Sequence, residues 1–192
     1  GEDESDSELP RLVTSAPRLQ QIACGELHCI GLTAEGTVLT WGSGLMGALG
    51  NGELSACKSP MPVKSLHAAG LVREVAAGRH HSLALSVAGD AYSWGMCAGL
   101  AGDCDVEPRK AHVGGRVSTI GCGDEYCAAL TPGGAVAWGG PLGSSTCLVL
   151  PAYDATRMAC GAASSPSHCQ TTPEMAPPSE TSPASASSDS SA

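Results

Sequence analysis

Cysteines and histidines are the residues of this sequence whose types and spacing could support chemistry. Four residues separate Cys24 from Cys29, with His28 beside the second cysteine, and Cys122 and Cys127 repeat the same spacing. Thiolate and imidazole are preferred ligands of zinc, and two neighbouring thiols can also form a disulfide. The spacing is wider than the Cys-x2-Cys pairs common in structural zinc sites. Disulfides and a metal site stay open as alternatives, while buried thiols are the favoured interpretation of the 10 cysteines.

Other signatures of catalysis are weak. His80-His81 is a lone doublet, and the glycine-rich loop Gly42–Gly52 lacks the Lys-Ser/Thr ending of a phosphate-binding loop. The sequence contains no Gly-x-Ser-x-Gly motif, and no pair of acids stands out for general acid–base work. We therefore predict a protein that is not an enzyme and that uses neither a cofactor nor a metal.

The same residue types occupy matching positions in a unit that the chain repeats. Residues 21–50, 73–102 and 118–143 align with one another, at spacings of about 53 and then about 45 residues, within the period range of repeat proteins. The coinciding positions are Gly25, Gly78 and Gly123; His28 and His81; Gly36, Gly89 and Gly134; and Trp41-Gly42, Trp94-Gly95 and Trp138-Gly139. Because a residue that recurs once per repeat usually serves the repeat, we interpret this set as structural.

Each repeat is expected to position these residues on four short strands. In the first repeat the strands are predicted at Leu19–Cys24, His28–Thr33, Thr37–Trp41 and Pro60–Leu66. In the second they are predicted at Leu71–Ala77, His80–Ser86, Ala91–Trp94 and Ala111–Val113, and in the third at Val117–Cys122, Tyr126–Thr131, Ala135–Trp138 and Thr146–Leu150. The 25 glycines fit many tight turns, and Gly36 suits a hairpin connection.

The two ends differ in composition from the repeats. Residues 1–17 are acidic and polar and residues 163–192 are rich in serine and proline, so both are predicted to be disordered tails. Between them, residues 18–162 divide into repeats at about 18–70, 71–116 and 117–156, with the stub of a fourth at 157–162. Because the first residue is not methionine, we expect a fragment of a larger regulatory protein.

Charge and hydropathy restrict the function classes. The chain has a formal net charge of -9, almost all of it in the two ends, while the 10 basic residues lie in the nearly neutral middle. Binding to a phosphate backbone needs clustered lysine or arginine, so the charge pattern argues against nucleic acid as a partner. No apolar run approaches the roughly 18 residues of a membrane span. We expect an intracellular protein with no membrane association, in either the cytoplasm or the nucleus.

The combined pattern resembles the regulator of chromosome condensation repeat. That pattern is Gly-x-x-His, then Leu, Gly, Trp-Gly and Gly-x-Leu-Gly, and here it reads Gly25 to His28, Leu32, Gly36, Trp41-Gly42 and Gly47 to Gly50. The second copy keeps Gly78, His81, Leu85, Gly89 and Trp94-Gly95, and it ends in Gly99-Leu100-Ala101-Gly102. The third keeps the glycines and Trp138-Gly139 but has Tyr126 where His is usual. The resemblance covers about three-quarters of the chain.

This resemblance implies an all-β fold, a partial β-propeller of about three four-stranded blades plus the stub of a fourth. It also implies a non-enzymatic protein–protein interaction module. Guanine-nucleotide exchange on a small GTPase, a role of some family members, is the second hypothesis. A cysteine-rich metal or redox protein is the third.

The candidate partner-binding residues are those that vary within the constant frame. Each Gly of the Gly-x-x-His motif is followed by a different pair, and these pairs are Glu26-Leu27, Arg79-His80 and Asp124-Glu125. If the repeats are equivalent, the three pairs line up along one face and could contact a protein partner. Unselected loop residues would give the same pattern, so that alternative stays open.

Overall fold

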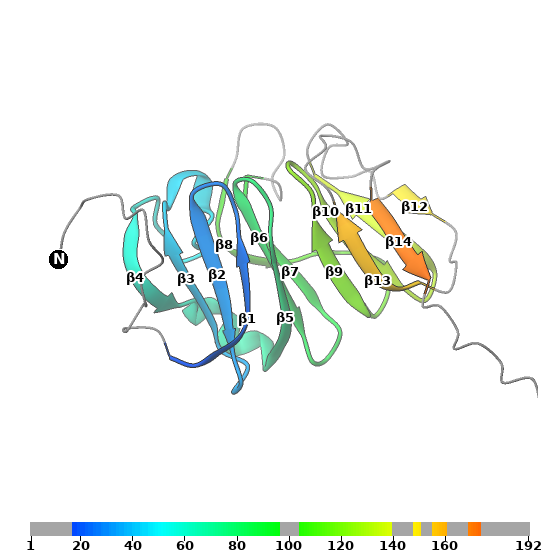
Figure 1. The fold of residues 1–192 in the computed structure, drawn as a ribbon, viewed down its shortest axis with the longest axis horizontal. Helices are drawn as coiled ribbons and strands as arrows, with labels where there is room; N and C mark the ends of the chain where they lie inside the picture. The colour runs from blue at the N-terminus through cyan, green and yellow to red at the C-terminus, as the bar shows by residue number, and fades with distance from the viewer. Residues whose placement is uncertain (1–16, 97–103, 140–147, 151–154, 161–168, 174–192) are drawn as a thin grey trace, which may run out of the picture.

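The computed structural model describes residues 17–96, 104–139, 148–150, 155–160 and 169–173. In this part of the chain, antiparallel β-sheets are joined by loops and two short 3-10 helices (Figure 1). The all-β class expected from the sequence is confirmed.

Three four-stranded sheets, called blades here, follow one another along the chain, and each keeps its strands in chain order. Blade 1 consists of β1 (Leu19–Cys24), β2 (His28–Thr33), β3 (Val38–Gly42) and β4 (Cys57–Pro62), with helices η1 (Leu45–Gly47) and η2 (Lys64–Ala69). Blade 2 consists of β5 (Val72–Ala77), β6 (His81–Ser86), β7 (Ala91–Gly95) and β8 (Asp105–Lys110). Blade 3 consists of β9 (Thr119–Cys122), β10 (Cys127–Thr131), β11 (Gly134–Trp138) and β12 (Leu148–Leu150). A two-stranded sheet of β13 (Ala155–Cys160) and β14 (Cys169–Pro173) comes last.

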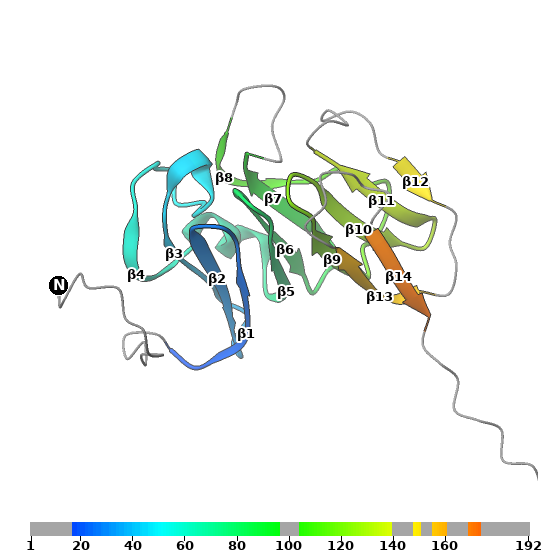
Figure 2. The same ribbon diagram turned by 45° about the horizontal axis from the view of Figure 1, so that its top comes forward.

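The blades stand side by side around a common inner edge (Figures 1 and 2). The first strand of each blade contacts the first strand of the next, so that β1 meets β5, β5 meets β9 and β9 meets β13. The radial arrangement of four-stranded sheets is that of a β-propeller. The described residues form an arc of three blades and a two-stranded stub, as predicted.

The hydrophobic core lies between the blades and forms two separate layers. The layer between blades 1 and 2 contains the buried residues Ile30, Leu32, Val38, Val63, Leu66, Val72, Val75, Ala84 and Trp94. The layer between blades 2 and 3 contains Leu83, Leu85, Ala91, Val117, Ile120, Tyr126, Cys127, Ala129, Val136 and Trp138. Strand β6 contributes to both layers because successive side chains of a strand point to opposite faces.

The strand register makes the three repeats equivalent. Each tryptophan of the signature lies directly opposite a residue of the second strand in its blade. The pairs are Cys29 with Trp41, Ser82 with Trp94, and Cys127 with Trp138. Trp94 and Trp138 are buried against the preceding blade, whereas Trp41 is half-buried, because no described strand packs on that face of blade 1.

Two predicted outer strands were wrong in position. The first was expected at Pro60–Leu66, but β4 ends at Pro62 and helix η2 follows it. The second was expected at Ala111–Val113, whereas β8 occupies the charged segment Asp105–Lys110. An outer strand is bonded on one side only and is mostly exposed, so its sequence shows little alternation of apolar and polar residues.

The ends of the repeat region also differ from the prediction. The stub was expected to stop at residue 162 and a disordered tail to begin at 163, yet Cys169–Pro173 pairs with β13 as strand β14. The predicted acidic tail falls almost entirely on residues 1–16, which lie outside the described residues, as do residues 174–192. In the described part of the chain, no helix is both long and apolar enough to span a membrane.

Candidate functional site

The Gly-x-x-His motif is a packing unit at the tip of each blade. The ring of His28 lies over Gly25, the ring of His81 over Gly78, and the ring of Tyr126 over Gly123. A Cβ atom on any of these glycines would collide with the ring, so the motif needs the smallest residue three positions before the ring. This explains why Tyr126 can replace histidine while Gly123 is kept.

A buried hydrogen-bond network joins blade 1 to blade 2 through the signature residues. The Ser82 hydroxyl and the Trp94 indole N–H both donate to the Ala48 carbonyl oxygen, each at 2.9 Å. His28 Nε2 lies 2.9 Å from Ser82 Oγ. Because the one hydroxyl hydrogen is directed at Ala48, Nε2 carries the hydrogen that it donates to Ser82. His28 and Trp94 therefore serve the contact between blades.

The protonation state of His28 follows from this environment. Burial lowers the pKa of His28 to about 4, and the neighbouring imidazoles of His81 and His80 act in the same direction. The side chain is therefore neutral at neutral pH. A neutral imidazole fixed by a hydrogen bond at one nitrogen is suited to packing and is poorly placed for proton exchange with solvent.

The remaining signature glycines adopt backbone conformations that other residues avoid. Gly36, Gly89 and Gly134, in the turns between the second and third strands, have φ values of 79°, 90° and 127°. Gly42, Gly95 and Gly139, after the tryptophans, have φ values of 103°, 89° and 93°. Left-handed φ is strained for residues with a Cβ, so these positions are structural too.

The three varying pairs lie together on what we call the tip surface, defined by Glu26, Leu27, Arg79, His80, Asp124 and Glu125. The loops that carry them are joined by backbone hydrogen bonds from one blade to the next. The Glu26 N–H donates to the Arg79 carbonyl at 3.1 Å, and the Arg79 N–H donates to the Asp124 carbonyl at 3.0 Å. The expected alignment of the pairs along one face is thus present in the structure.

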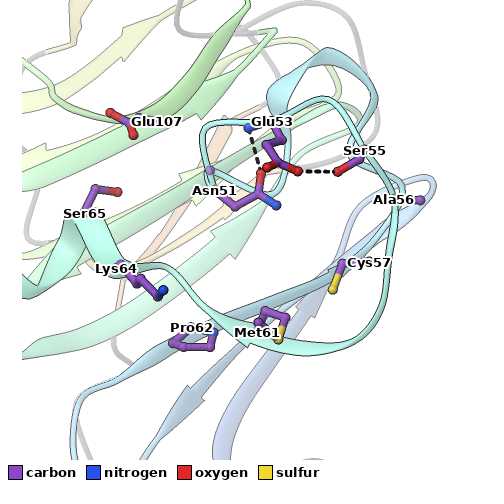
Figure 3. Close-up of a pocket in the computed structure, with 11 residues that line it drawn as sticks. Asn51, Glu53, Ser55, Ala56, Cys57, Met61, Pro62, Lys64, Ser65 and Glu107 are labelled. Carbon is purple, nitrogen blue, oxygen red and sulfur yellow. Dashed lines mark hydrogen bonds between the residues drawn. The ribbon is translucent and has the colours of Figure 1, made fainter.

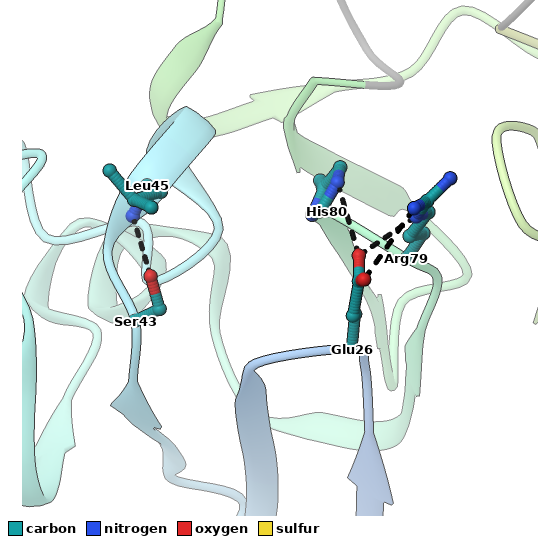
Figure 4. Close-up of polar contacts among 5 residues, drawn as sticks. All are labelled: Glu26, Ser43, Leu45, Arg79 and His80. Carbon is teal, nitrogen blue, oxygen red and sulfur yellow. Dashed lines mark hydrogen bonds and ion pairs between the residues drawn. The ribbon is translucent and has the colours of Figure 1, made fainter.

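Part of the charge on the tip surface is used within the chain. Arg79 Nε lies 2.8 Å from Glu26 Oε2, and His80 Nε2 lies 3.3 Å from the same oxygen (Figure 4). The hydrogen bond from Arg79 lowers the pKa of Glu26, and the same bond raises the pKa of Arg79. Both side chains remain largely exposed, so salt screens the pair and its contribution to stability is small.

Four exposed apolar residues lie at the same end of the blades, and of these the sequence analysis named Leu27 but missed Leu45, Met46 and Met96. Leu27 is 59% exposed, Leu45 60%, Met46 42% and Met96 51%. The N–H of Ser43, two residues before Leu45, donates to the Leu27 carbonyl (Figure 4). The Met96 N–H donates to the His80 carbonyl. These bonds hold both loops beside the tip surface. The sequence could have indicated these residues, because the loops that carry them begin at Ser43 and Met96, directly after a repeated Trp-Gly pair.

The repeated frame matches known repeats. The family profile "Regulator of chromosome condensation (RCC1) repeat" matches residues 35–85, and a second profile of that description matches residues 20–48. The human probable E3 ubiquitin-protein ligase HERC3 is 40% identical over 138 residues, covering 67% of this chain and 13% of HERC3. The chain carries RCC1 repeats.

Solved structures agree with this assignment of the fold. The crystal structure of human WBSCR16 superimposes with a TM-score of 0.64 at 28% identity, over 74% of this chain and 40% of that one. Prp20p from Saccharomyces cerevisiae gives a TM-score of 0.59 at 22% identity, over 74% of this chain and 42% of that one. This chain therefore spans less than half the length of each of these two solved chains.

A surface hollow is lined by residues of blade 1 and by Glu107 of blade 2. It encloses about 490 Å³ beside β4 and the loop after η1, and its lining includes Glu53, Lys64 and Glu107 (Figure 3). The Glu53 carboxylate accepts a hydrogen bond from Ser55 at 2.8 Å. Among the described residues, no group of three or more His, Cys, Asp or Glu side chains is arranged to hold a metal ion.

Proposed function

We propose that this chain is a non-enzymatic interaction module whose tip surface, extended by Leu45, Met46 and Met96, binds a protein partner. One observation carries the proposal. The backbone frame is the same in each blade, while the side chains on the tip surface differ in size and charge. Four large apolar groups are exposed there, Leu27 on the tip surface and Leu45, Met46 and Met96 beside it. Exposed apolar groups bordered by charges are typical of protein-binding surfaces.

The charges of the tip surface restrict the partner. Glu26, Asp124 and Glu125 are acidic, and Arg79 is the one arginine or lysine of the set. A surface of this sign repels phosphate backbones and favours a partner that combines apolar with basic side chains. The signature histidine His28 is neutral and committed to Ser82, so it supports binding between blades instead of catalysis.

The experiment compares two ends of the same blades. A double variant Leu27→Glu/Met96→Glu places charge on the tip surface, and a control Leu71→Glu/Val87→Glu places the same charge on residues that are 63% and 52% exposed. The control residues lie at the opposite end, where the Val87 N–H donates to the Leu71 carbonyl. Co-purification measured by quantitative mass spectrometry should lose a partner at least tenfold with the first variant and keep it with the second. Equal loss with both variants, or with neither, would contradict the proposal.

A small GTPase is the second candidate partner. It is supported by the RCC1 repeats and by the likeness to Prp20p, a protein with binding properties to Gsp1p and histones. Exchange activity would require the chain to bind the nucleotide-free GTPase more tightly than the loaded form. Purified GTPases loaded with a fluorescent nucleotide should release it faster when the chain is added, and slower again with Leu27→Glu/Met96→Glu. Unchanged release rates would exclude this role while leaving the interaction module intact.

A further inference from the structure

Cysteines recur as directly opposed pairs at one position of the repeat. This position joins the end of the first strand of a blade to the beginning of the second strand, next to the tip loop. The pairs in register there are Cys24 with Cys29 in blade 1, Cys122 with Cys127 in blade 3 and Cys160 with Cys169 in the last sheet, while blade 2 has Ala77 with Ser82. The spacing noted in the sequence is therefore a cross-strand pairing.

The geometry of the blade 1 pair suits a direct sulfur–sulfur bond. The Gly25 N–H donates to the His28 carbonyl at 2.9 Å, so Cys24 and Cys29 form the next, non-hydrogen-bonded pair, in which opposed side chains are closest. Their Sγ atoms lie 3.5 Å apart as thiols. The spacing of about 4.5 Å between Cα atoms at such pairs lies within the range that disulfides span.

Access distinguishes this pair from its counterpart in blade 3. Cys24 is exposed and Cys29 half-buried, and they face away from blade 2, because the next residue Ile30 points into the layer between the blades. Cys127 occupies the matching position in blade 3 but faces blade 2 and is 0% exposed. Its partner Cys122 is partly exposed, so in blade 3 one of the two sulfurs is closed to solvent, whereas in blade 1 both the exposed Cys24 and the half-buried Cys29 reach it.

We propose that Cys24 and Cys29 form a reversible dithiol–disulfide site that reacts with small-molecule disulfides such as oxidised glutathione. The site lies on the face of blade 1 against which no described strand packs, and it does not depend on the proposed binding role of the tip surface. An exposed bridge is also the kind that small thiols reduce readily, which makes the site reversible.

The reaction is a two-electron thiol–disulfide exchange. The thiolate of the exposed Cys24 attacks one sulfur of the small disulfide, forms a mixed disulfide and releases one small thiolate. The thiolate of Cys29 then attacks the Cys24 sulfur, forms the Cys24–Cys29 bond and releases the second small thiolate. The two protons lost by the cysteines end on the released thiolates, so the chain is oxidised and the small disulfide is reduced.

The order of attack follows from the surroundings of the two sulfurs. Burial raises the pKa of the Cys29 thiol to about 11, and a hydrogen bond and charge from Cys24 contribute to the rise. Cys29 is therefore a poor first nucleophile. The contribution of Cys24 disappears once Cys24 has formed the mixed disulfide, which assigns Cys29 the second, resolving step.

The test treats the whole chain with oxidised glutathione and then locates the bridge. Glu26 lies between the two cysteines, so a protease that cleaves after glutamate separates them unless a disulfide joins the fragments. Mass spectrometry should find these fragments linked, the link should disappear with reduced glutathione, and Cys122 and Cys127 should stay unlinked over the same period. A bridge that forms equally fast in blade 3 would overturn the argument from access.

Blade 2 supplies the matched control variants, because Ala77 and Ser82 occupy these positions there in a folded blade. Cys29→Ser should accumulate a stable glutathione adduct on Cys24, because the resolving thiol is missing. Cys24→Ala should form neither adduct nor bridge at this site. A stable adduct on Cys24 in the unsubstituted chain, or no reaction of Cys24 while iodoacetamide still labels it, would sink the proposal.

A spectroscopic measurement is independent of the mapping. Trp41 lies directly opposite Cys29 in the register, and a disulfide quenches the emission of an adjacent indole. Oxidation should therefore lower tryptophan fluorescence in the unsubstituted chain and leave it unchanged in Cys24→Ala. Equal fluorescence changes in both proteins would place the reaction elsewhere.

Discussion

His28 shows how one residue of a repeated motif acquires its role from a neighbouring blade. Its place over Gly25 could be suspected from the Gly-x-x-His spacing, since both residues belong to one hairpin. Its hydrogen-bond partner Ser82 could not, because Ser82 lies 54 positions away in the next blade. The sequence therefore predicts that the residue is structural but does not identify what it holds.

The buried neutral state of His28 makes stability depend on pH. Folding lowers the pKa of this imidazole from 6.5 to about 4, so between these values the unfolded chain binds a proton that the folded chain refuses. The contribution of neutral His28 to the free energy of unfolding is therefore complete above pH 6.5. It is lost as the pH falls towards 4, and the loss amounts to roughly 3 kcal/mol. Urea unfolding at several pH values should show this loss.

The variant His28→Gln isolates the residue from the other titrating groups. Glutamine keeps an N–H donor for Ser82 but does not titrate, so this protein should lose clearly less stability over the same pH window. Parallel pH profiles of the two proteins would show that His28 is not responsible.

Among the elements, the inner strands were predictable and the outer ones were not. The bounds predicted for β1 and β2 agree with the structure, because Gly25 follows β1, the turn with Gly36 follows β2, and apolar residues alternate or run continuously along the strands. Strand β8 has the sequence DVEPRK and forms because it can pair with β7, with Lys110 opposite Tyr92. Such a strand is specified by its neighbour, so its own residues carry little signal. The candidate site was also only partly predictable: the sequence indicated the varying pairs after each glycine, but not the exposed apolar residues beside them.

Blade 2 holds the loop after β3 through Trp94, whose indole N–H binds the Ala48 carbonyl of that loop. The stability that this contact provides can be measured with a substitution of Trp94. Trp94→Phe removes the indole N–H that binds the Ala48 carbonyl in a buried site, and we expect a loss of about 1 to 3 kcal/mol in unfolding free energy. Trp41→Phe is the matched control, since its indole makes no hydrogen bond with the described residues and is half-buried. Denaturant unfolding should show less than about 1 kcal/mol for the control. Equal losses of unfolding free energy in the two variants would show that the hydrogen bond to the Ala48 carbonyl does not account for the contribution of Trp94.

At the scale of the whole molecule, stability is distributed over layers instead of a single centre. The middle blade packs on both sides, and all six residues of β6 are buried. Blade 1 has described neighbours on one side only. A molecule built in this way should open from its outer elements, because each layer can separate without disrupting the other.

Native-state hydrogen exchange can test this order of opening. Amides in His81–Ser86 should exchange slowest, because exposing them requires opening the middle blade, and amides in the outer strand Cys57–Pro62 should exchange fastest among the strands of blades 1 and 2. Uniform protection across both blades would indicate that the arc unfolds as one unit.

The backbone hydrogen bonds that connect neighbouring tips have a consequence for how such a protein can change. The contacts from Glu26 to Arg79 and from Arg79 to Asp124 involve only main-chain N–H and C=O groups, which every amino acid except proline provides in full. Substitutions at these positions can therefore alter recognition while the scaffold stays the same. One architecture could acquire new binding specificities through a handful of codon changes, and a designer could randomise the same sites to build a display library.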